Sequence, residues 1–202
     1  ADENVGYVVR VVPKDYQPET LSDFAKAAGS ELVQLLKSPS HRRRMEAQRE
    51  LIRRGLDDST ADAVHALAAD DAQPLASRVA AIFALKQALK ERSTKHLVKL
   101  AQIDDVRQYA LRALTDRPEE TSGDATAAIL AGLKDANPNV RREAAVALAR
   151  TGKTEHASEL TALLTDVDSL VVHTAIAALV RLDAVDACLT IIDRTDASPA
   201  AR

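Results

Sequence analysis

Few residues in this chain of 202 residues could bind a metal or act as a nucleophile. They are one cysteine, Cys188, and five histidines. The histidines show neither the HExxH spacing of zinc hydrolases nor any pair at i and i+4, and Cys188 lacks the partners of a thiolate zinc site or a disulfide. We predict no metal and no bound cofactor, and expect surface or boundary positions for His41, His65, His96, His156 and His173.

Other catalytic patterns are also missing. The sequence has no Gly-rich phosphate loop, no nucleophile elbow and no Ser/His/Asp order, and its carboxylates fall on alternating polar faces. We therefore predict that the chain is not an enzyme and has no small-molecule substrate.

The densest charge cluster is the run KSPSHRRRMEAQRELIRR, with arginines from Arg42 to Arg54. Such a cluster could contact phosphates of nucleic acid or a lipid surface. Glu46 and Glu50, however, stand three or four residues from arginines, and no aromatic residues interleave for base stacking. Because the net charge is −3, we favour a solvated, self-paired face over a nucleic-acid-binding one.

A repeated unit positions these side chains, and it is clearest in DANPNVRREAAVALARTG, Asp135 to Gly152. Pro138 can begin a helix, Asp135 and Asn137 offer oxygens to its first amides, and Gly152 can end it. The unit recurs as a small-then-large pair whose alanines, the register alanines, are 34, 29, 34 and 31 residues apart. Two helical patterns in each such period are typical of an α-solenoid. The pairs are Ala47 and Leu51, Ala81 and Leu85, Ala110 and Leu114, Ala144 and Leu148, and Ala175 and Leu179.

Arginine stands three residues before the register alanine in four of the five copies. A cation in the first turn of a helix opposes the helix dipole, so an acidic partner is expected to hold it. We predict a ladder in which each arginine pairs with a loop aspartate of its own or the neighbouring repeat and which lapses at the fifth copy, at Val172. The ladder arginines are Arg44, Arg78, Arg107 and Arg141, and the candidate partners are Asp71, Asp104, Asp105 and Asp135.

The spacing, the aspartate loops, the dipeptides Val106-Arg107 and Val140-Arg141 and the Ala/Leu pairs together resemble HEAT repeats, over roughly Ser30 to Ile192. The resemblance implies an all-α fold, a right-handed α-solenoid of about five helical hairpins with a short N-terminal extended segment. We expect residues 1–29 to be an extended leader or linker with a short helix at Leu21 to Ala28, and residues 30–202 to be the solenoid. The polar linker RPEETSGD should protrude from it as a loop.

The N-terminal run Gly6 to Val12, GYVVRVV, is rich in β-branched residues and ends at Pro13, as a strand does. No other segment of the chain could pair with it. Two interpretations stay open: a flexible leader laid on the first helices, or the last strand of a preceding β domain.

Three stretches resemble one particular group more closely: GYVVRVVP, SPSHRRRMEAQRELIRRG and LVVHTAIAALVRLDAVDACL. They are similar to the HEAT-repeat region of large planctomycete-type multidomain proteins, which join a sugar-dehydrogenase-like propeller to HEAT repeats and often a cytochrome c domain. The resemblance implies a periplasmic or exported location. It also implies structural roles for Ala47, Gln48, Arg49, Leu51, Arg54 and Gly55. The haem motif CxxCH is absent, so we expect no haem in this segment.

A second stripe, two, five and nine residues after the ladder position, should lie on the exposed side of the second helices. In HEAT-like proteins these helices commonly line the concave surface, and aromatic residues and arginine are enriched at interfaces. The alternative is that the aromatics are simply packed and the arginines ordinary. The predicted protein-binding surface is Arg49, Arg53, Phe83, Tyr109, Arg112, Arg150 and Arg181.

The expected function is a non-catalytic scaffold that docks other domains of its parent chain or a partner protein. One alternative resembles the HEAT-fold alkylpurine DNA glycosylases, with the Arg42 to Arg54 cluster on DNA; the lack of Trp counts against it. Another resembles HEAT-like lyases that attach bilin pigments. We expect no membrane span, because no apolar run is long enough.

Overall fold

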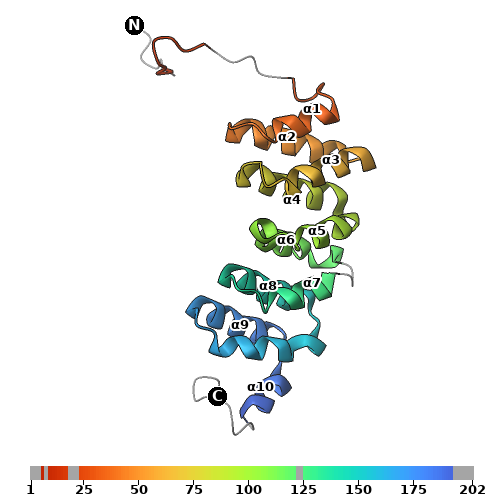
Figure 1. Ribbon diagram of the computed structural model, residues 1–202, viewed down its shortest axis with the longest axis vertical. Coiled ribbons are helices and arrows are strands. Elements are labelled where there is room, and N and C mark those ends of the chain that lie inside the picture. The colour runs from red at the N-terminus through yellow and green to blue at the C-terminus, as the bar shows by residue number, and fades with distance from the viewer. Residues whose placement is uncertain (1–5, 7–8, 18–22, 122–124, 193–202) are drawn as a thin grey trace.

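The computed structural model of the chain describes residues 6, 9–17, 23–121 and 125–192. Within these residues every regular element is a helix and no strand is formed. Five helical hairpins follow one another and stack into an elongated solenoid, with one further helix, α10 (Val185–Ile192), after them (Figure 1). The predicted all-α solenoid of about five hairpins is confirmed.

Each hairpin contributes one helix to each of two layers. The second helices follow the inner side of a shallow curve, on the left in Figure 1. The first helices are α1 (Gly29–Leu35), α3 (Asp58–Ala69), α5 (Thr94–Leu100), α7 (Ala125–Gly132) and the 3-10 helix η4 (Thr154–Thr165). The second helices are α2 (His41–Arg54), α4 (Leu75–Leu89), α6 (Arg107–Leu114), α8 (Pro138–Thr151) and α9 (Ser169–Arg181). Three short 3-10 helices lie in the connections: η1 (Lys90–Ser93), η2 (Asp104–Val106) and η3 (Pro118–Glu120).

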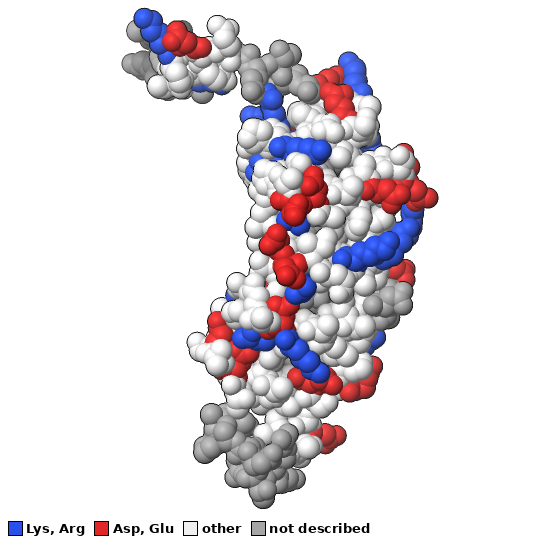
Figure 2. Space-filling view, in the orientation of Figure 1, with Lys and Arg blue, Asp and Glu red and all other residues white. Residues whose placement is uncertain are grey.

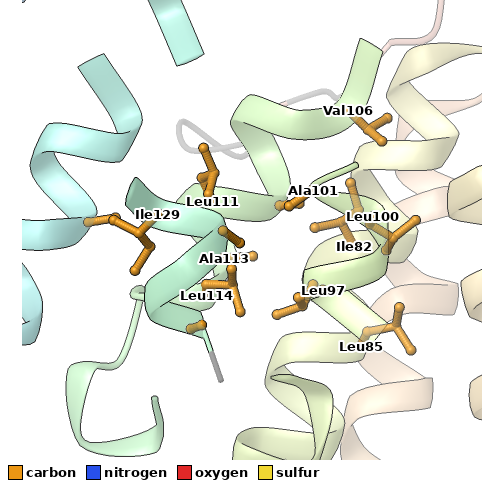
Figure 3. Packing of buried hydrophobic residues seen from close by; sticks show 14 of the residues in the cluster. Ile82, Leu85, Leu97, Leu100, Ala101, Val106, Leu111, Ala113, Leu114 and Ile129 are labelled. Carbon is orange, nitrogen blue, oxygen red and sulfur yellow. The ribbon is translucent and has the colours of Figure 1, made fainter. Parts of the chain in front are cut away.

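The core runs along the seam between the layers, and the Ala/Leu pairs lie in it. Every register alanine and every leucine paired with it is at most 4% exposed. Figure 3 shows part of this packing: Leu85, Leu114 and Ile129, from three successive hairpins, belong to one continuous cluster of buried side chains. The contact is close: a Cβ built on Gly132 of α7 would lie 2.9 Å from the Cβ of Ala144 and 2.8 Å from Leu111 Cδ1. Larger side chains here would push the helices apart.

The boundaries of α8 follow the expected chemistry. Pro138 is its first residue, and the side chain of Asn137 accepts a hydrogen bond from the amide of Asn139 at 2.9 Å. Gly152 ends it with a φ of 68°, in the left-handed region that favours glycine.

The N-terminal region differs from the sequence-based prediction. Residues 23–28 form a turn, with the amides of Lys26 and Ala27 bonded to the carbonyl of Asp23, so the helix predicted at Leu21 to Ala28 is wrong there; residues 21 and 22 lie outside the described part. The first helix instead begins at Gly29. Of the run Gly6 to Val12, residues 7 and 8 are outside the described part, and the others adopt no strand, because no neighbouring strand completes their hydrogen bonds.

Two further segments differ from the sequence-based prediction. The described part of RPEETSGD does not protrude: Thr121 Oγ1 donates to the carbonyl of Leu114 at 2.8 Å, and Glu120 approaches Lys86. The first helix of the fifth hairpin, η4, is a 3-10 helix instead of an α-helix. Its buried residues recur every three positions, at Ala157, Leu160 and Leu163, which matches the three residues per turn of that helix.

Candidate functional site

Three of the four ladder arginines pair with an aspartate of the next hairpin. Arg107 is bonded to Asp135, and Arg78, which is buried, has Nη1 3.4 Å from Asp105 Oδ2. Arg141 makes a two-pronged contact with Asp166, Nε to Oδ2 at 2.6 Å and Nη2 to Oδ1 at 2.7 Å. The bonds with Asp166 raise the pKa of Arg141 and lower that of Asp166. Each of these ion pairs therefore joins one hairpin to the next.

All four ladder arginines also donate to carbonyl oxygens in the last turn of the first helix of their own hairpin or within three residues after it. These carbonyls have no partner inside the helix, and the negative end of its dipole favours a cation. This contact offsets the unfavourable interaction between the arginine and the positive end of the dipole of the second helix, in whose first turn it lies. The nitrogen–oxygen distances are 2.7 Å for Arg44 and Ser38, 3.0 Å for Arg78 and Ala68, 2.9 Å for Arg107 and Ala101, and 2.8 Å for Arg141 and Asp135.

The observed pairing differs in two respects from the predicted ladder. Asp71 has no contact with a ladder arginine, and Arg44 has no carboxylate partner within the described residues. Sequence reasoning also missed Asp166. The signal was available, because Asp166 stands six residues before Val172, as Asp135 stands six residues before Arg141.

Three of the six arginines in the α2 cluster pair with glutamates of their own helix. Arg53 Nη2 lies 2.6 Å and Arg54 Nε 2.5 Å from Glu50 Oε1, and Arg49 Nη1 is 3.3 Å from Glu46. The hydrogen bonds from Arg53 and Arg54 lower the pKa of Glu50 from 4.5 to about 2. On the face shown in Figure 2, Lys and Arg alternate with Asp and Glu along the whole solenoid. That distribution does not resemble the basic stripe of a nucleic-acid-binding protein.

A groove of about 580 Å³ opens on the face of the second helices, where α2, α4 and α6 meet. Its walls are mainly apolar. Met45 and Leu75 are 43% and 45% exposed, and the rings of Phe83 and Tyr109 are half-buried beside them. These large side chains adjoin one another and remain in contact with water, so they offer an apolar surface on which a partner could pack. The other lining residues are His41, Arg44, Gln48, Ala76, Val79, Ala80 and Gln87.

The groove contains only part of the predicted protein-binding surface. Phe83 and Tyr109 line it together, as members of neighbouring second helices. The predicted arginines are spread over α2, α6, α8 and α9 and do not line it: Arg49, Arg53, Arg112 and Arg181 are exposed, and Arg150 is half-buried. Sequence reasoning missed Met45 and Leu75. Both occupy positions that lie on the polar face of their helices by spacing. Only the packing of α2 against α4 shows that they line a groove.

Two histidines lie against each other away from this groove. The rings of His65 on α3 and His96 on α5 have centroids 5.2 Å apart. His96 is buried, so its expected surface or boundary position is wrong; the stacking of α5 on α3 covers it. Burial lowers the pKa of both. The part of the chain that the structure describes contains no group of three or more His, Cys, Asp or Glu side chains arranged to hold a metal ion.

Comparison with known families decides the classification. A family model described as HEAT repeats matches residues 94–180 and again residues 126–202, which together make up more than half of the chain. The chain belongs to the HEAT-repeat family. No curated protein matches the sequence.

Solved structures share this HEAT-type fold at low sequence identity. A chain from the complex of CpcE and CpcF of phycocyanin lyase from Nostoc sp. PCC7120 is 17% identical, with 94% of this chain and 76% of that chain covered and a TM-score of 0.57. The Escherichia coli protein YibA is 18% identical, with 92% and 86% covered and a TM-score of 0.51. At these identities the likeness concerns the HEAT fold alone. No described helix is long and apolar enough to cross a membrane.

Proposed function

We propose that this HEAT-repeat protein is a non-catalytic scaffold whose groove between α2, α4 and α6 docks an amphipathic helix of a partner protein. The observation that carries the proposal is the cluster of exposed apolar side chains in the groove, Met45 and Leu75 beside Phe83 and Tyr109. Aromatic rings fixed in a groove are typical anchors of helix recognition.

The charge around the groove indicates the polarity of the partner. His41 lines it at the first residue of α2, Arg42 follows, and the first turn of that helix has no acidic residue. The positive end of the helix dipole adds to these side chains. The partner helix therefore presents apolar residues at i, i+3, i+4 and i+7 and an acidic residue at the end that lies near His41.

Fluorescence anisotropy with labelled model peptides tests this proposal. Two peptides share a leucine face at that spacing and end in either three glutamates or three lysines. The acidic peptide should bind more tightly, and Leu75→Glu should weaken it at least about tenfold by placing a charge in the apolar wall. Leu170→Glu, at a similarly exposed leucine of α9, is the matched control and should leave binding unchanged. Equal binding by the Leu75→Glu and Leu170→Glu variants, or no binding of either peptide, contradicts the proposal that the groove docks a helix.

The wider setting is part of the same proposal. The three stretches that resemble planctomycete-type multidomain proteins support a role for residues 30–202 as a spacer between catalytic domains of a larger exported protein, behind a leader of residues 1–29. The coding sequence around these residues tests this setting: a propeller domain upstream supports it, and its absence contradicts it.

Nucleic-acid binding finds less support. Glu46 and Glu50 already engage Arg49, Arg53 and Arg54, so a phosphate would have to displace a carboxylate. Retardation of DNA at low salt, lost on Arg42→Ala, would favour this alternative over helix docking. Pigment attachment, the second alternative from the sequence, is supported only by the fold that this chain shares with a chain of the phycocyanin lyase complex.

A further inference from the structure

Helices α9 and α10 expose a surface whose equivalents are covered in the second, third and fourth hairpins. The residues one and five positions after the register alanine face the part of the solenoid that follows: Lys86 pairs with Glu120 in η3, and Leu111 lies against Gly132 of α7. In the second, third and fourth hairpins they are at most 6% exposed. In the fifth hairpin the same positions are Ile176 and Val180, which are 48% and 75% exposed. The buried equivalents are Ile82 and Lys86, Leu111 and Thr115, and Ala145 and Ala149.

Helix α10 extends this apolar surface. Val185, Leu189 and Ile192 are each more than half exposed, and with α9 they border a groove of about 500 Å³. We call this exposed surface the terminal face: Ile176, Val180, Val185, Leu189 and Ile192.

We propose that the terminal face binds a second copy of this chain through the same face, with α9 of the second copy in the place that the next second helix takes in earlier repeats. The stacking seam requires a second helix with an apolar edge, and α9 is such a helix. A face that is apolar along one edge of α9 is complementary to itself under a two-fold axis.

The charges near the face agree with a two-fold contact. Asp183 lines the groove, and Arg181 lies exposed two residues earlier. A surface that carries both signs at its edge can place each arginine near the partner's aspartate. The ladder position of this hairpin is Val172, so the face requires no aspartate from its partner at that position. Recognition then rests on the apolar edge, with the charges setting the orientation.

Sedimentation velocity of the full chain over a range of concentrations tests this inference. A reversible dimer is expected. Val180→Asp should weaken dimerisation at least about tenfold, and because Val180 is 75% exposed the substitution should leave the helical circular dichroism unchanged. Leu189→Asp gives the same test from α10. Val167→Asp is the matched control, because Val167 is 99% exposed in the loop before α9 and does not line the groove.

A chain that stays monomeric overturns the inference and leaves the face to another partner. So does a dimer that survives both Val180→Asp and Leu189→Asp. The outcome is independent of the docking proposal, because the groove of α2, α4 and α6 shares no lining residue with the terminal face.

Discussion

Lys86 on α4 and Glu120 in η3 meet inside the solenoid, with Nζ 3.3 Å from Oε2. Lys86 is only 1% exposed, at a position filled by Thr115 and Ala149 in the next two repeats. An ammonium group there has lost its water, so its carboxylate partner and the η3 segment that carries it become part of the core.

Removing one partner of this pair should cost far more than removing the charge altogether. Glu120→Gln leaves a buried ammonium group without its counter-charge, and should lower the free energy of unfolding by about 3 kcal/mol. Lys86→Met should be neutral or stabilising, and Lys86→Met with Glu120→Gln should recover most of the loss. Urea titration measures all three, with exposed Glu119→Gln as the control. A Lys86→Met variant as unstable as Glu120→Gln would show that the pair itself, and not the desolvated cation, is what matters.

The ladder predicts a stability effect at Arg141. Arg141→Lys keeps the charge but loses the paired geometry with Asp166, and should lower the free energy of unfolding by about 1–3 kcal/mol. Arg112→Ala, at an exposed arginine of α6, should change it by less than about 0.5 kcal/mol. Thermal or urea denaturation compares the two. Equal stability of Arg141→Lys and the unmodified protein would remove the ladder from the forces that join the hairpins.

Glu50 makes stability depend on pH in the acid range. The pKa of Glu50 in the folded protein is about 2, below the value of 4.5 for an unperturbed side chain. Its contribution to the free energy of unfolding is therefore complete above pH 4.5 and is lost as the pH falls through about 2. The difference in unfolding free energy between the protein and Glu50→Gln should therefore shrink over that interval. Urea titrations at a series of pH values measure it, beside Glu46→Gln, whose exposed pair with Arg49 should matter little. A difference that stays constant down to pH 2 contradicts the assignment.

Gly132 tests the close approach of α7 to its neighbours. Helix propensity alone predicts that Gly132→Ala stabilises the helix by about 1 kcal/mol. Because the new methyl group would lie 2.8 Å from Leu111 Cδ1 and 2.9 Å from the Ala144 Cβ, we expect a loss of roughly 1–3 kcal/mol instead. Exposed Ala131→Ser is the control and should change stability by less than about 0.5 kcal/mol. A gain in melting temperature for Gly132→Ala would show that the helices can separate at little cost.

The fold could be predicted from the sequence because its determinants are local and repeated. The register alanines and the arginine spacing recur with the period of the hairpin, so agreement among copies outweighs the weakness of any single copy. The leader had no such support, since a β-branched run such as Gly6 to Val12 indicates a strand only where a second strand can pair with it.

The groove could be predicted only in part. Phe83 and Tyr109 stand out because aromatic residues are rare in this chain, at 2%. Met45 and Leu75 do not, because their exposure depends on the angle between α2 and α4. The pair of Lys86 and Glu120 could not be predicted for a similar reason. A lysine at that helical spacing ordinarily reaches water, and Lys86 is enclosed only because η3 folds back against α4.

The ladder also distinguishes the junctions between hairpins. Within the described residues its ion pairs join the second hairpin to the third, the third to the fourth and the fourth to the fifth, while Arg44 has no such pair across the junction of the first two. That junction is where α2 meets α4 and the groove opens. The groove therefore lies at the one junction among the described hairpins that this ladder leaves without an ion pair, so there the packing of α2 against α4 alone sets how wide the groove is for a partner helix.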